Sequence, residues 1–504
     1  MPAYKPATEC FAAGRLSKPM SELAQQFNEA PRLRWEVANL ESVLKVDFAH
    51  VIMLHEQGYL SKEQAASMLQ ELKTIRSGGP EAFGTAAGYG SIVLQIERKL
   101  SEHIGSEIAG RMPIARSRLD HGGTFRRIVD RAGVLSVLDG LLNLQETFIR
   151  VATKYASTVF VSYTHMQQAQ PTTFGHYLLA YNDRVRDCFE QLCQIYDRTN
   201  RCPLGAVGLS GTDLNIDRER TASLLGFSEV LVNSRLGRDA NYEMEIAFAL
   251  TLLLSTLNDL CSDLHICASV EFGTIDLDDG HCSTSSIFPQ KKNPYALETV
   301  KATAADSQGW LAGTLARFRC EGSFDTAIRC TNSISDYCSI TKSMLSLTCQ
   351  VVDELKVNED RCEGLLTNAW VTTNRLANVL LTQHGLSYRS SHSLVGRLVR
   401  NCVDQKVAKP DVTIDMLQKA AEEMGMERIN MSQAELQAGL GHKEYIAKSI
   451  SQGSVGPKQV KILVRMASAQ FNIDNTLLEG KLKELVKAND LLDSEAEMII
   501  NNVE

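Results

Sequence analysis

One segment of the chain reads Ser283-Thr-Ser-Ser-Ile-Phe-Pro-Gln-Lys-Lys-Asn-Pro294, and it joins a polar loop to a helical pattern that begins at Tyr295. The unpaired N–H groups at the start of a helix favour negative charge. Serine hydroxyls, lysine ammonium groups and an asparagine amide in this position therefore suit a carboxylate ligand or an incipient anion. A solvated Ser/Lys loop is the other interpretation of these residues.

Length and composition describe an ordinary globular protein. The 504 residues exceed one compact core, which predicts roughly two to four domains. A net charge of −8 speaks against nucleic acid as the main partner, because phosphate binding needs basic surface. The longest apolar run, residues 246–255, is too short to cross a membrane and predicts a buried helix. Residues 1–6 lack the apolar region of a signal peptide, so a cytoplasmic location is expected.

The thirteen cysteines are scattered and form no Cys-x-x-Cys pair. This spacing favours reduced cysteines in the core over structural zinc or a disulfide framework.

Helical periodicity follows nearly the whole chain. Ser61-Lys-Glu-Gln64 is a capping box at the start of one predicted helix. Long helices without intervening strand signals are predicted over about 121–156, 239–272, 294–318 and 333–355. Successive helices of about 30 residues indicate a bundle, often shared between subunits. We therefore predict an all-α protein with three helical domains: residues 1–115, a central long-helix bundle over 116–362, and residues 363–504, which include an amphipathic extension from 467.

Three other polar segments interrupt the helices. Arg116-Ser117-Arg118 precedes a helix and can grip a carboxylate, although Arg-Ser-Arg is also common on surfaces. Residues 162–171 place Thr164 and His165 among three glutamines, where a histidine is as often structural as catalytic, and Pro171 fits the first turn of the next helix. Residues 202–212 contain Gly-x-x-Gly, but no strand is predicted before it, so a nucleotide site is not expected.

The four segments resemble signatures of the aspartase/fumarase superfamily. Residues 283–294 are similar to G-S-S-x-M-P-x-K-x-N-P, in the P-Q-K-K-N-P form usual in argininosuccinate lyases. Residues 115–121 resemble G-R-S-R-N-D-Q, residues 162–171 resemble G-Y-T-H-L-Q-R-A-Q-P, and residues 202–212 resemble P-L-G-S-G-A-x-A-G. The resemblance spans residues 12–466.

The resemblance implies a cofactor-independent carbon–nitrogen lyase that reversibly eliminates an amine from an N-substituted aspartate to give fumarate. It implies a homotetramer with the long-helix bundle as its core, in which three subunits complete each site. Ser285 takes the role of base, and His165 an acid/base or orienting role. Substrate-binding roles fall on Ser117, Arg118, Thr164, Gln168, Lys291, Asn293 and Arg329. No metal, nucleic acid or membrane partner is expected, and His176 is expected to serve packing or hydrogen bonding.

Two departures from the family pattern bear on the substrate. Leu119 stands where the family has an asparagine that hydrogen-bonds substrate. In a gap-free alignment of residues 321–332, Phe324, Arg329 and Asn332 replace a tyrosine, a glutamine and a lysine. The cation of Arg329 repels a guanidinium and suits a more acidic amine partner.

We therefore predict an aminopolycarboxylic acid substrate of the N-succinyl amino acid or diamine type, as in ethylenediamine-disuccinate lyase and aspergillomarasmine synthase. Argininosuccinate itself is the alternative substrate. A catalytically silent, crystallin-like structural relative is the alternative outside enzymes.

Overall fold

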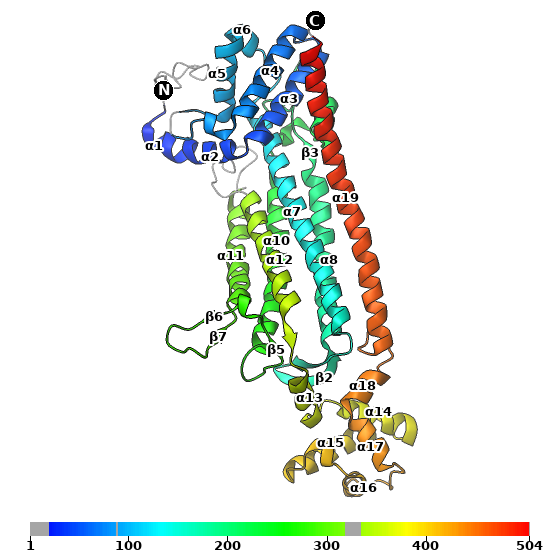
Figure 1. The fold of residues 1–504 in the computed structure, drawn as a ribbon. Coiled ribbons are helices and arrows are strands. Elements are labelled where there is room, and N and C mark those ends of the chain that lie inside the picture. The colour runs from blue at the N-terminus through cyan, green and yellow to red at the C-terminus, as the bar shows by residue number, and fades with distance from the viewer. Residues whose placement is uncertain (1–19, 87–88, 318–333, 503–504) are drawn as a thin grey trace.

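The computed structural model describes residues 20–86, 89–317 and 334–502, which form an elongated, almost entirely helical molecule (Figure 1). The strands are short: β1 and β2 have six and seven residues, and every other described strand has two. The prediction of an all-α fold is confirmed.

A cluster of helices forms the end of the molecule that holds the N-terminal part. Its elements are α1 (Glu22–Ala24), a π-helix (Gln25–Glu29), α2 (Ala30–Ala38), α3 (Leu40–Glu56), α4 (Lys62–Gly78), a 3₁₀ turn (Pro80–Ala82), α5 (Ile92–Ile104) and α6 (Ser106–Ala109). Ser61 and Gln64 form the predicted capping box at the start of α4. Helix α3 is buried over most of its length, from Val43 to Leu54, because the other helices of this end surround it.

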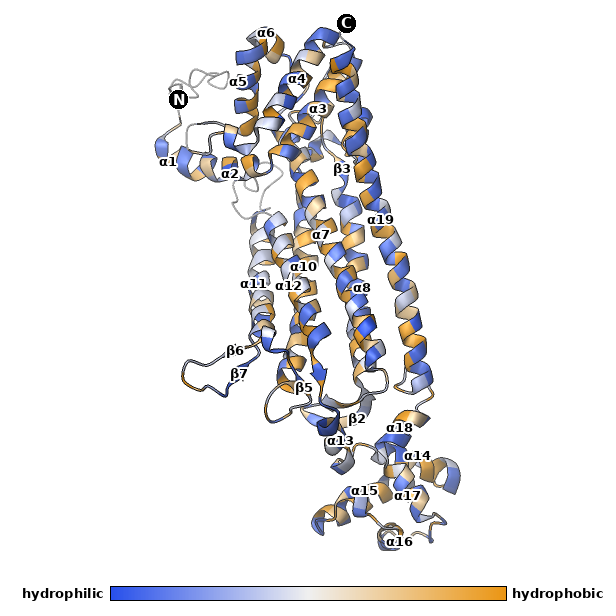
Figure 2. Cartoon of the chain, in the orientation of Figure 1, coloured by the Kyte–Doolittle hydropathy of each residue, from blue (hydrophilic) through white to orange (hydrophobic). Residues whose placement is uncertain are grey.

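The middle of the molecule is a bundle of five long helices: α7 (Arg118–Lys154), α8 (Phe174–Thr199), α10 (Asn241–Cys267), α11 (Tyr295–Arg317) and α12 (Ile334–Glu354). Their facing sides form one hydrophobic cluster, and Figure 2 shows apolar residues along the inner faces of these helices. Two glycines of α7 allow α12 to approach closely. A Cβ on Gly133 would lie 3.1 Å from Cys338, and one on Gly140 would lie 3.0 Å from Leu345.

Helix α10 is, within the described part of the chain, the one helix long and apolar enough to cross a membrane. Most of its most apolar window, 61%, is buried inside the bundle. This agrees with the buried helix predicted from residues 246–255. The cytoplasmic location stays a prediction.

Six short helices form a group beyond the bundle, and the four of them within residues 373–440 share a hydrophobic cluster of their own. They are α13 (Glu359–Asn368), α14 (Thr373–His384), α15 (Tyr388–Asp404), α16 (Ile414–Glu423), α17 (Gln433–Leu440) and α18 (His442–Lys448), with a 3₁₀ turn at Lys409–Asp411. The chain then returns along the bundle as α19 (Pro457–Asn501) (Figure 1). At about 1.5 Å per residue, this helix spans roughly 68 Å. Its end packs Leu492 and Ala496 into the core of the N-terminal helices.

The extension from residue 467 is therefore part of one continuous helix that packs along the surface of the same chain. Leu478 is 3% exposed, whereas Leu477, Leu482 and Val486 are 46%, 43% and 56% exposed. The predicted domain boundaries stay a prediction.

Two sequence predictions are wrong because short strands occur between the helices. Residues 162–171 are not a plain polar interruption: β1 (Val159–Thr164) and β2 (Gln167–Thr173) pair as an antiparallel hairpin. Pro171 lies within β2, and Thr173 caps the next helix, α8, by accepting a hydrogen bond from His176 N. A two-residue strand, β3 (Arg201–Cys202), does precede the Gly-x-x-Gly loop and pairs in parallel with β4 (Glu229–Val230).

The remaining elements are α9 (Arg218–Leu224), a 3₁₀ turn (Ser234–Leu236), β5 (Ile275–Asp276), a 3₁₀ turn (Asp279–His281), β6 (Ser283–Thr284), β7 (Lys292–Asn293) and β8 (Lys356–Val357). The ten cysteines in the described residues are free, and none is exposed. Seven of these ten are buried and three are half-buried, and their reduced state stays a prediction.

Candidate active site

The signature segment 283–294 forms a hairpin that projects from the bundle just before α11. Strands β6 and β7 pair Ser283 with Asn293 and Thr284 with Lys292, which closes the loop at its base. Inside the loop, the Ser285 hydroxyl oxygen accepts hydrogen bonds from the backbone N–H groups of Ile287 at 3.2 Å and Phe288 at 3.1 Å. Donors that converge on an oxygen stabilise its anionic form. The loop thus directs two N–H donors at the Ser285 oxygen.

The two lysines of the loop have different surroundings. Lys292 Nζ donates to Asp276 Oδ1 at 3.0 Å and contacts Asp279 Oδ1 at 2.8 Å, and these carboxylates raise the pKa of Lys292. Lys292 therefore ties the hairpin to the preceding turn. Lys291 is exposed, and within the described residues its ammonium has no partner. It is the lysine free to bind a ligand.

The first polar segment lies at the start of α7, where Ser117 is the N-cap. Asp120 organises this turn: its Oδ1 accepts from Ser117 N at 2.8 Å, and its Oδ2 accepts from Gly205 N and Val207 N, both at 2.9 Å. The Gly-x-x-Gly loop is thus fastened to the start of α7 by one carboxylate. Arg118 is exposed there.

A buried charged cluster on the protein side of this turn holds the Arg116–His121 segment in place. Asp47 of α3 is 0% exposed, and its Oδ1 accepts from Arg116 at 2.6 Å and from His121 Nε2 at 3.0 Å. Burial alone would raise the pKa of Asp47, but the two partners hold it below its usual range. Nearby, burial and the charge of Arg116 lower the pKa of His50 to about 3, so this histidine is neutral. A carboxylate with these partners fixes where the Arg116–His121 turn lies.

The second polar segment is the tip of the β1–β2 hairpin, at the other end of α7. His165 and Met166 have φ values of 54° and 57°, so both central residues of the turn are left-handed. Such two-residue turns normally favour asparagine and glycine, and strained backbone of this kind is concentrated at functional sites. Thr164, His165 and Gln168 are all exposed here. His176, in contrast, hydrogen-bonds Thr172 at 3.2 Å and Gly453 O at 2.9 Å, which confirms its predicted supporting role.

A single chain does not bring these segments together. Ser117 begins α7, and the hairpin with His165 follows its end. A helix of 37 residues is about 55 Å long. Figure 1 shows the β6–β7 loop reaching outward from the bundle, away from the start of α7. Arg329 and the rest of 318–333 lie outside the described residues.

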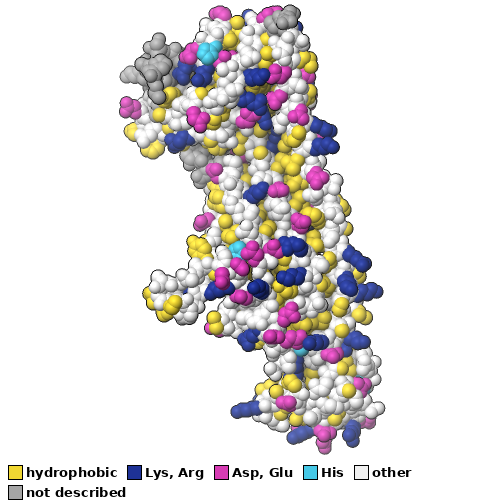
Figure 3. Space-filling model, in the orientation of Figure 1, with side chains coloured by type: hydrophobic (Ala, Val, Ile, Leu, Met, Phe, Trp, Pro, Cys, Tyr) yellow, Lys and Arg dark blue, Asp and Glu magenta, His cyan; other side chains and the backbone are white. Residues whose placement is uncertain are grey.

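The tip of the signature loop exposes apolar side chains to solvent. Ile287 is 77% exposed and Phe288 is 54% exposed, and Figure 3 shows hydrophobic side chains at the tip of the projecting loop. The long helices carry further exposed apolar residues: Phe248, Leu252 and Ile266 on α10, Tyr295 and Leu315 on α11, and Ile340 on α12. Exposed apolar side chains form a contact surface where they lie together.

Comparison with known proteins gives the chain a family. A family model described as "Lyase" matches residues 14–309, and one described as "Argininosuccinate lyase C-terminal" matches residues 370–434. The chain is 30% identical over 484 residues to the argininosuccinate lyase of Methanocaldococcus jannaschii, covering 95% of this chain and 98% of the relative. The chain belongs to the aspartase/fumarase superfamily, in its argininosuccinate lyase-like branch.

Solved structures agree with this placement. An EDDS lyase variant with bound fumarate superposes with a TM-score of 0.85 at 28% identity, over 96% of this chain and 97% of the other. A class II fumarase from Schistosoma mansoni has a TM-score of 0.65 at 14% identity, over 81% of this chain and 90% of that one, and shows the shared fold alone. As a member of this branch, the chain is a carbon–nitrogen lyase of the fumarate-forming class, whose members act on small dicarboxylates.

Sequence reasoning missed the buried support of the site. Asp47 sits in a plain helical stretch, and only its contact with Arg116 and His121 gives it a role. Asp120 was recognised as part of a motif, but its bonds to the 202–212 loop join segments 85 and 87 residues apart. A carboxylate within an apolar helical pattern was the one available signal for Asp47.

Proposed function

We propose that this protein is a lyase for an aminopolycarboxylic acid: it eliminates an amine from an N-succinyl amino acid or diamine to give fumarate, or adds the amine to fumarate. The observation that carries the chemistry is the Ser285 hydroxyl held by two N–H donors in a loop that ends at a helix start. The likeness to EDDS lyase supports the substrate class, together with Leu119 and Arg329.

In the proposed reaction, the Ser285 oxygen removes a proton from the carbon next to a carboxylate. The electron pair of that C–H bond moves into the carboxylate and gives an aci-carboxylate dianion. The dianion then re-forms the carbonyl, makes the carbon–carbon double bond and breaks the carbon–nitrogen bond, so fumarate and the amine leave. The nitrogen takes up a proton, directly or through water, with His165 as the proposed acid or orienting group.

The dianion must be bound more tightly than the substrate if the reaction is to be fast. One well-placed donor is worth about 2.7–4 kcal/mol, so several are required. We assign this role to Lys291, Asn293, Thr164, Gln168, Ser117 and Arg118.

We further propose that the site is composite and that the protein is a homotetramer. The length of α7 keeps Ser117 and His165 of one subunit about 55 Å apart, so a complete site needs loops from neighbouring subunits. The exposed apolar residues on α10, α11 and α12 supply a surface for this contact.

The test is to incubate the protein with fumarate and, in turn, aspartate, diaminopropionate, ethylenediamine and arginine, and to read products by mass spectrometry. We expect an adduct with the mass of fumarate plus an amine other than arginine. Arginine as the sole productive amine would establish the alternative, an argininosuccinate lyase. No adduct with any amine, and no fumarate from the corresponding N-succinyl compounds, would contradict the proposal.

A further inference from the structure

A small cavity lies beside the first polar segment, between α2, α5, α7 and the start of α10. Its volume is about 70 Å³, several times the 10–15 Å³ that one water needs. One wall is apolar and the other is cationic. The apolar wall consists of Trp35, Val93, Leu119, Phe125, Ala240 and Tyr242, and the charged and polar residues are Arg32, Arg118, Arg126, Arg238, Glu36, Asp239, Ser91 and His121.

Three polar atoms on residues that line this cavity are buried without a hydrogen-bond partner in the described part of the chain: Ser91 Oγ, Trp35 Nε1 and His121 Nδ1. Ser91 and His121 are 4% and 1% exposed. A buried polar group without a partner costs about 1–3 kcal/mol, so three at one cavity indicate a polar occupant. His121 Nε2 donates to the Asp47 carboxylate, so Nδ1 is the ring nitrogen left for an occupant of the cavity.

The charge of the cavity is positive. Four arginines line it against two acids. The carboxylate of Glu36 is already engaged, by Arg32 at 3.2 Å and by Ile92 N at 3.0 Å. Arg126 pairs with Glu243 at 3.1 Å, whereas Arg118 has no partner in the described residues. A guanidinium ligand would meet like charge here, and a carboxylate would meet opposite charge.

We propose that this cavity binds the amine partner of the reaction and that the partner is an α-amino acid without a cationic side-chain guanidinium. The inference rests on the proposed function and narrows it, because a diamine without a carboxylate is excluded. The carboxylate of the partner faces the N–H of Trp35 and the cationic wall of the cavity, with the Ser91 hydroxyl beside it. His121 Nδ1 hydrogen-bonds the same ligand.

The test is a charge reversal at Ser91. Ser91 is the N-cap of α5 but makes no side-chain capping bond, and aspartate is as good an N-cap as serine, so Ser91→Asp is expected to fold. The matched control is Ser61→Asp, which adds the same charge at another helix N-cap of the same end, on an exposed residue. Both variants and the wild type are assayed for addition of aspartate and diaminopropionate to fumarate, and both amino acids, with arginine and ethylenediamine, are titrated into each protein by calorimetry.

We expect Ser91→Asp to raise the KM and Kd for aspartate at least about tenfold, which corresponds to about 1.4 kcal/mol. The KM for fumarate should change by less than about twofold. Ser61→Asp should change none of these values. We expect arginine and ethylenediamine to bind the wild type at least tenfold more weakly than aspartate. Equal effects of the two variants, an equal rise in the fumarate KM, or tighter binding of arginine than aspartate by the wild type would overturn the inference. If an amine reacts with fumarate but Ser91→Asp does not change the KM and Kd for aspartate, the cavity assignment fails and the proposed function stands. If no amine reacts, the proposed function fails. The calorimetric titrations then still show whether the cavity binds an amino acid.

Discussion

At the scale of single residues, the two adjacent lysines of the signature loop have different contacts. Lys292 is held by Asp276 and Asp279 and keeps the hairpin in place, whereas Lys291 is exposed and free to bind. From the sequence alone, either lysine could anchor the loop and either could bind the ligand. The structure assigns the anchoring role through contacts with the preceding turn.

Lys291→Met is therefore expected to weaken binding of a dicarboxylate inhibitor. A hydrogen bond to a charged group is worth about 1.5–3 kcal/mol, so the Kd rises by at least about tenfold. Calorimetric titration with succinate measures it, and Lys62→Met, an exposed lysine of α4, is the control. An unchanged Kd in Lys291→Met would remove this residue from the carboxylate site.

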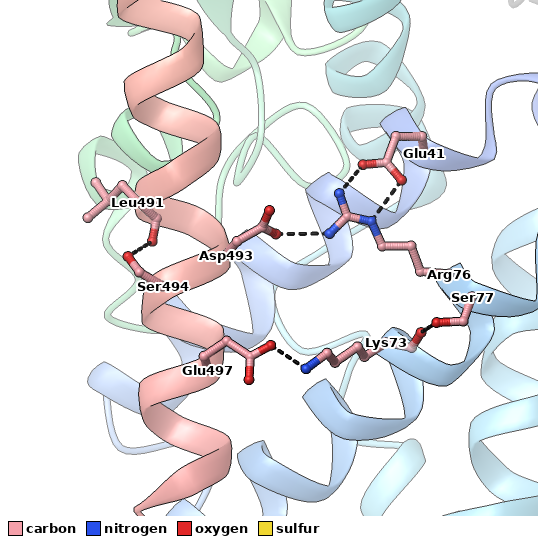
Figure 4. Close-up of polar contacts among 8 residues, drawn as sticks. All are labelled: Glu41, Lys73, Arg76, Ser77, Leu491, Asp493, Ser494 and Glu497. Carbon is pink, nitrogen blue, oxygen red and sulfur yellow. Dashed lines mark hydrogen bonds and ion pairs between the residues drawn. The ribbon is translucent and has the colours of Figure 1, made fainter.

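At the scale of elements, α19 is held to the N-terminal helices by apolar packing and by ion pairs. Figure 4 shows Arg76 of α4 between Glu41 and Asp493, with Lys73 directed to Glu497. Arg76 contacts Asp493 at 2.9 Å. These groups are largely exposed, and exposed pairs contribute only about 0–1 kcal/mol. The buried Leu492, 2% exposed, is expected to dominate.

Two variants separate these contributions. Leu492→Ala removes buried methyl groups and is expected to lower the free energy of unfolding by about 2–5 kcal/mol. Asp493→Asn removes one charge and is expected to lower it by less than about 1 kcal/mol. Urea unfolding followed by circular dichroism compares them. A larger effect of Asp493→Asn would mean that the ion pairs, not the packing, hold the helix.

A buried lysine in the C-terminal group gives a pH-dependent stability. Lys409 is 5% exposed, its Nζ donates to Leu366 O at 2.7 Å, and burial lowers its pKa to about 8. Between pH 8 and 10.5 the unfolded chain holds the proton and the folded chain does not, so the free energy of unfolding rises with pH across this window. At 1.36 kcal/mol per pKa unit the rise is about 3 kcal/mol.

Lys409→Met removes this titration. We expect its free energy of unfolding to be higher than that of the wild type at pH 7 and to lose the rise between pH 8 and 10.5. Thermal unfolding at a series of pH values is the measurement. If the free energy of unfolding rises equally with pH in the wild type and in Lys409→Met, another group causes the rise.

Most of the helices were predictable from the sequence, and the elements that were missed have physical reasons. The periodicity of apolar residues located the long helices, and Ser61 marked the start of α4 correctly. The β1–β2 hairpin was missed because Val159–Thr164 is only six residues long and Gln167–Thr173 is mostly polar, and Pro171 looked like a helix start. A two-residue strand such as β3 exists only through its pairing with β4, which no local pattern predicts.

At the scale of the whole molecule, the separation of the polar segments is the main fact. The candidate residues were found from motifs, but a sequence does not say which segments meet across subunits. Asp47 and Asp120 are the clearest examples of support that appears only in three dimensions. The cavity beside Arg118 is another, because its walls come from four helices.

The proposed composite site predicts complementation between inactive variants. Ser285→Ala and His165→Ala subunits are each expected to form inactive assemblies. When they are refolded together in equal amounts, random mixing in a closed oligomer leaves about one quarter of the sites with both wild-type residues. Recovery of about that share of wild-type activity is expected. No recovery, with mixed oligomers shown by native mass spectrometry, would mean that Ser285 and His165 act from one subunit.

The most direct measurement is fumarate release by Ser285→Ala, followed by ultraviolet absorbance with the N-succinyl amino acid that the wild type uses. The hydroxyl oxygen of Ser285 is placed to take the proton, and its removal leaves the two N–H donors and the helices of the fold unchanged. The account predicts a loss of turnover of at least about a thousandfold, equal to about 4 kcal/mol, with wild-type thermal unfolding. Near-normal fumarate release by Ser285→Ala would contradict it.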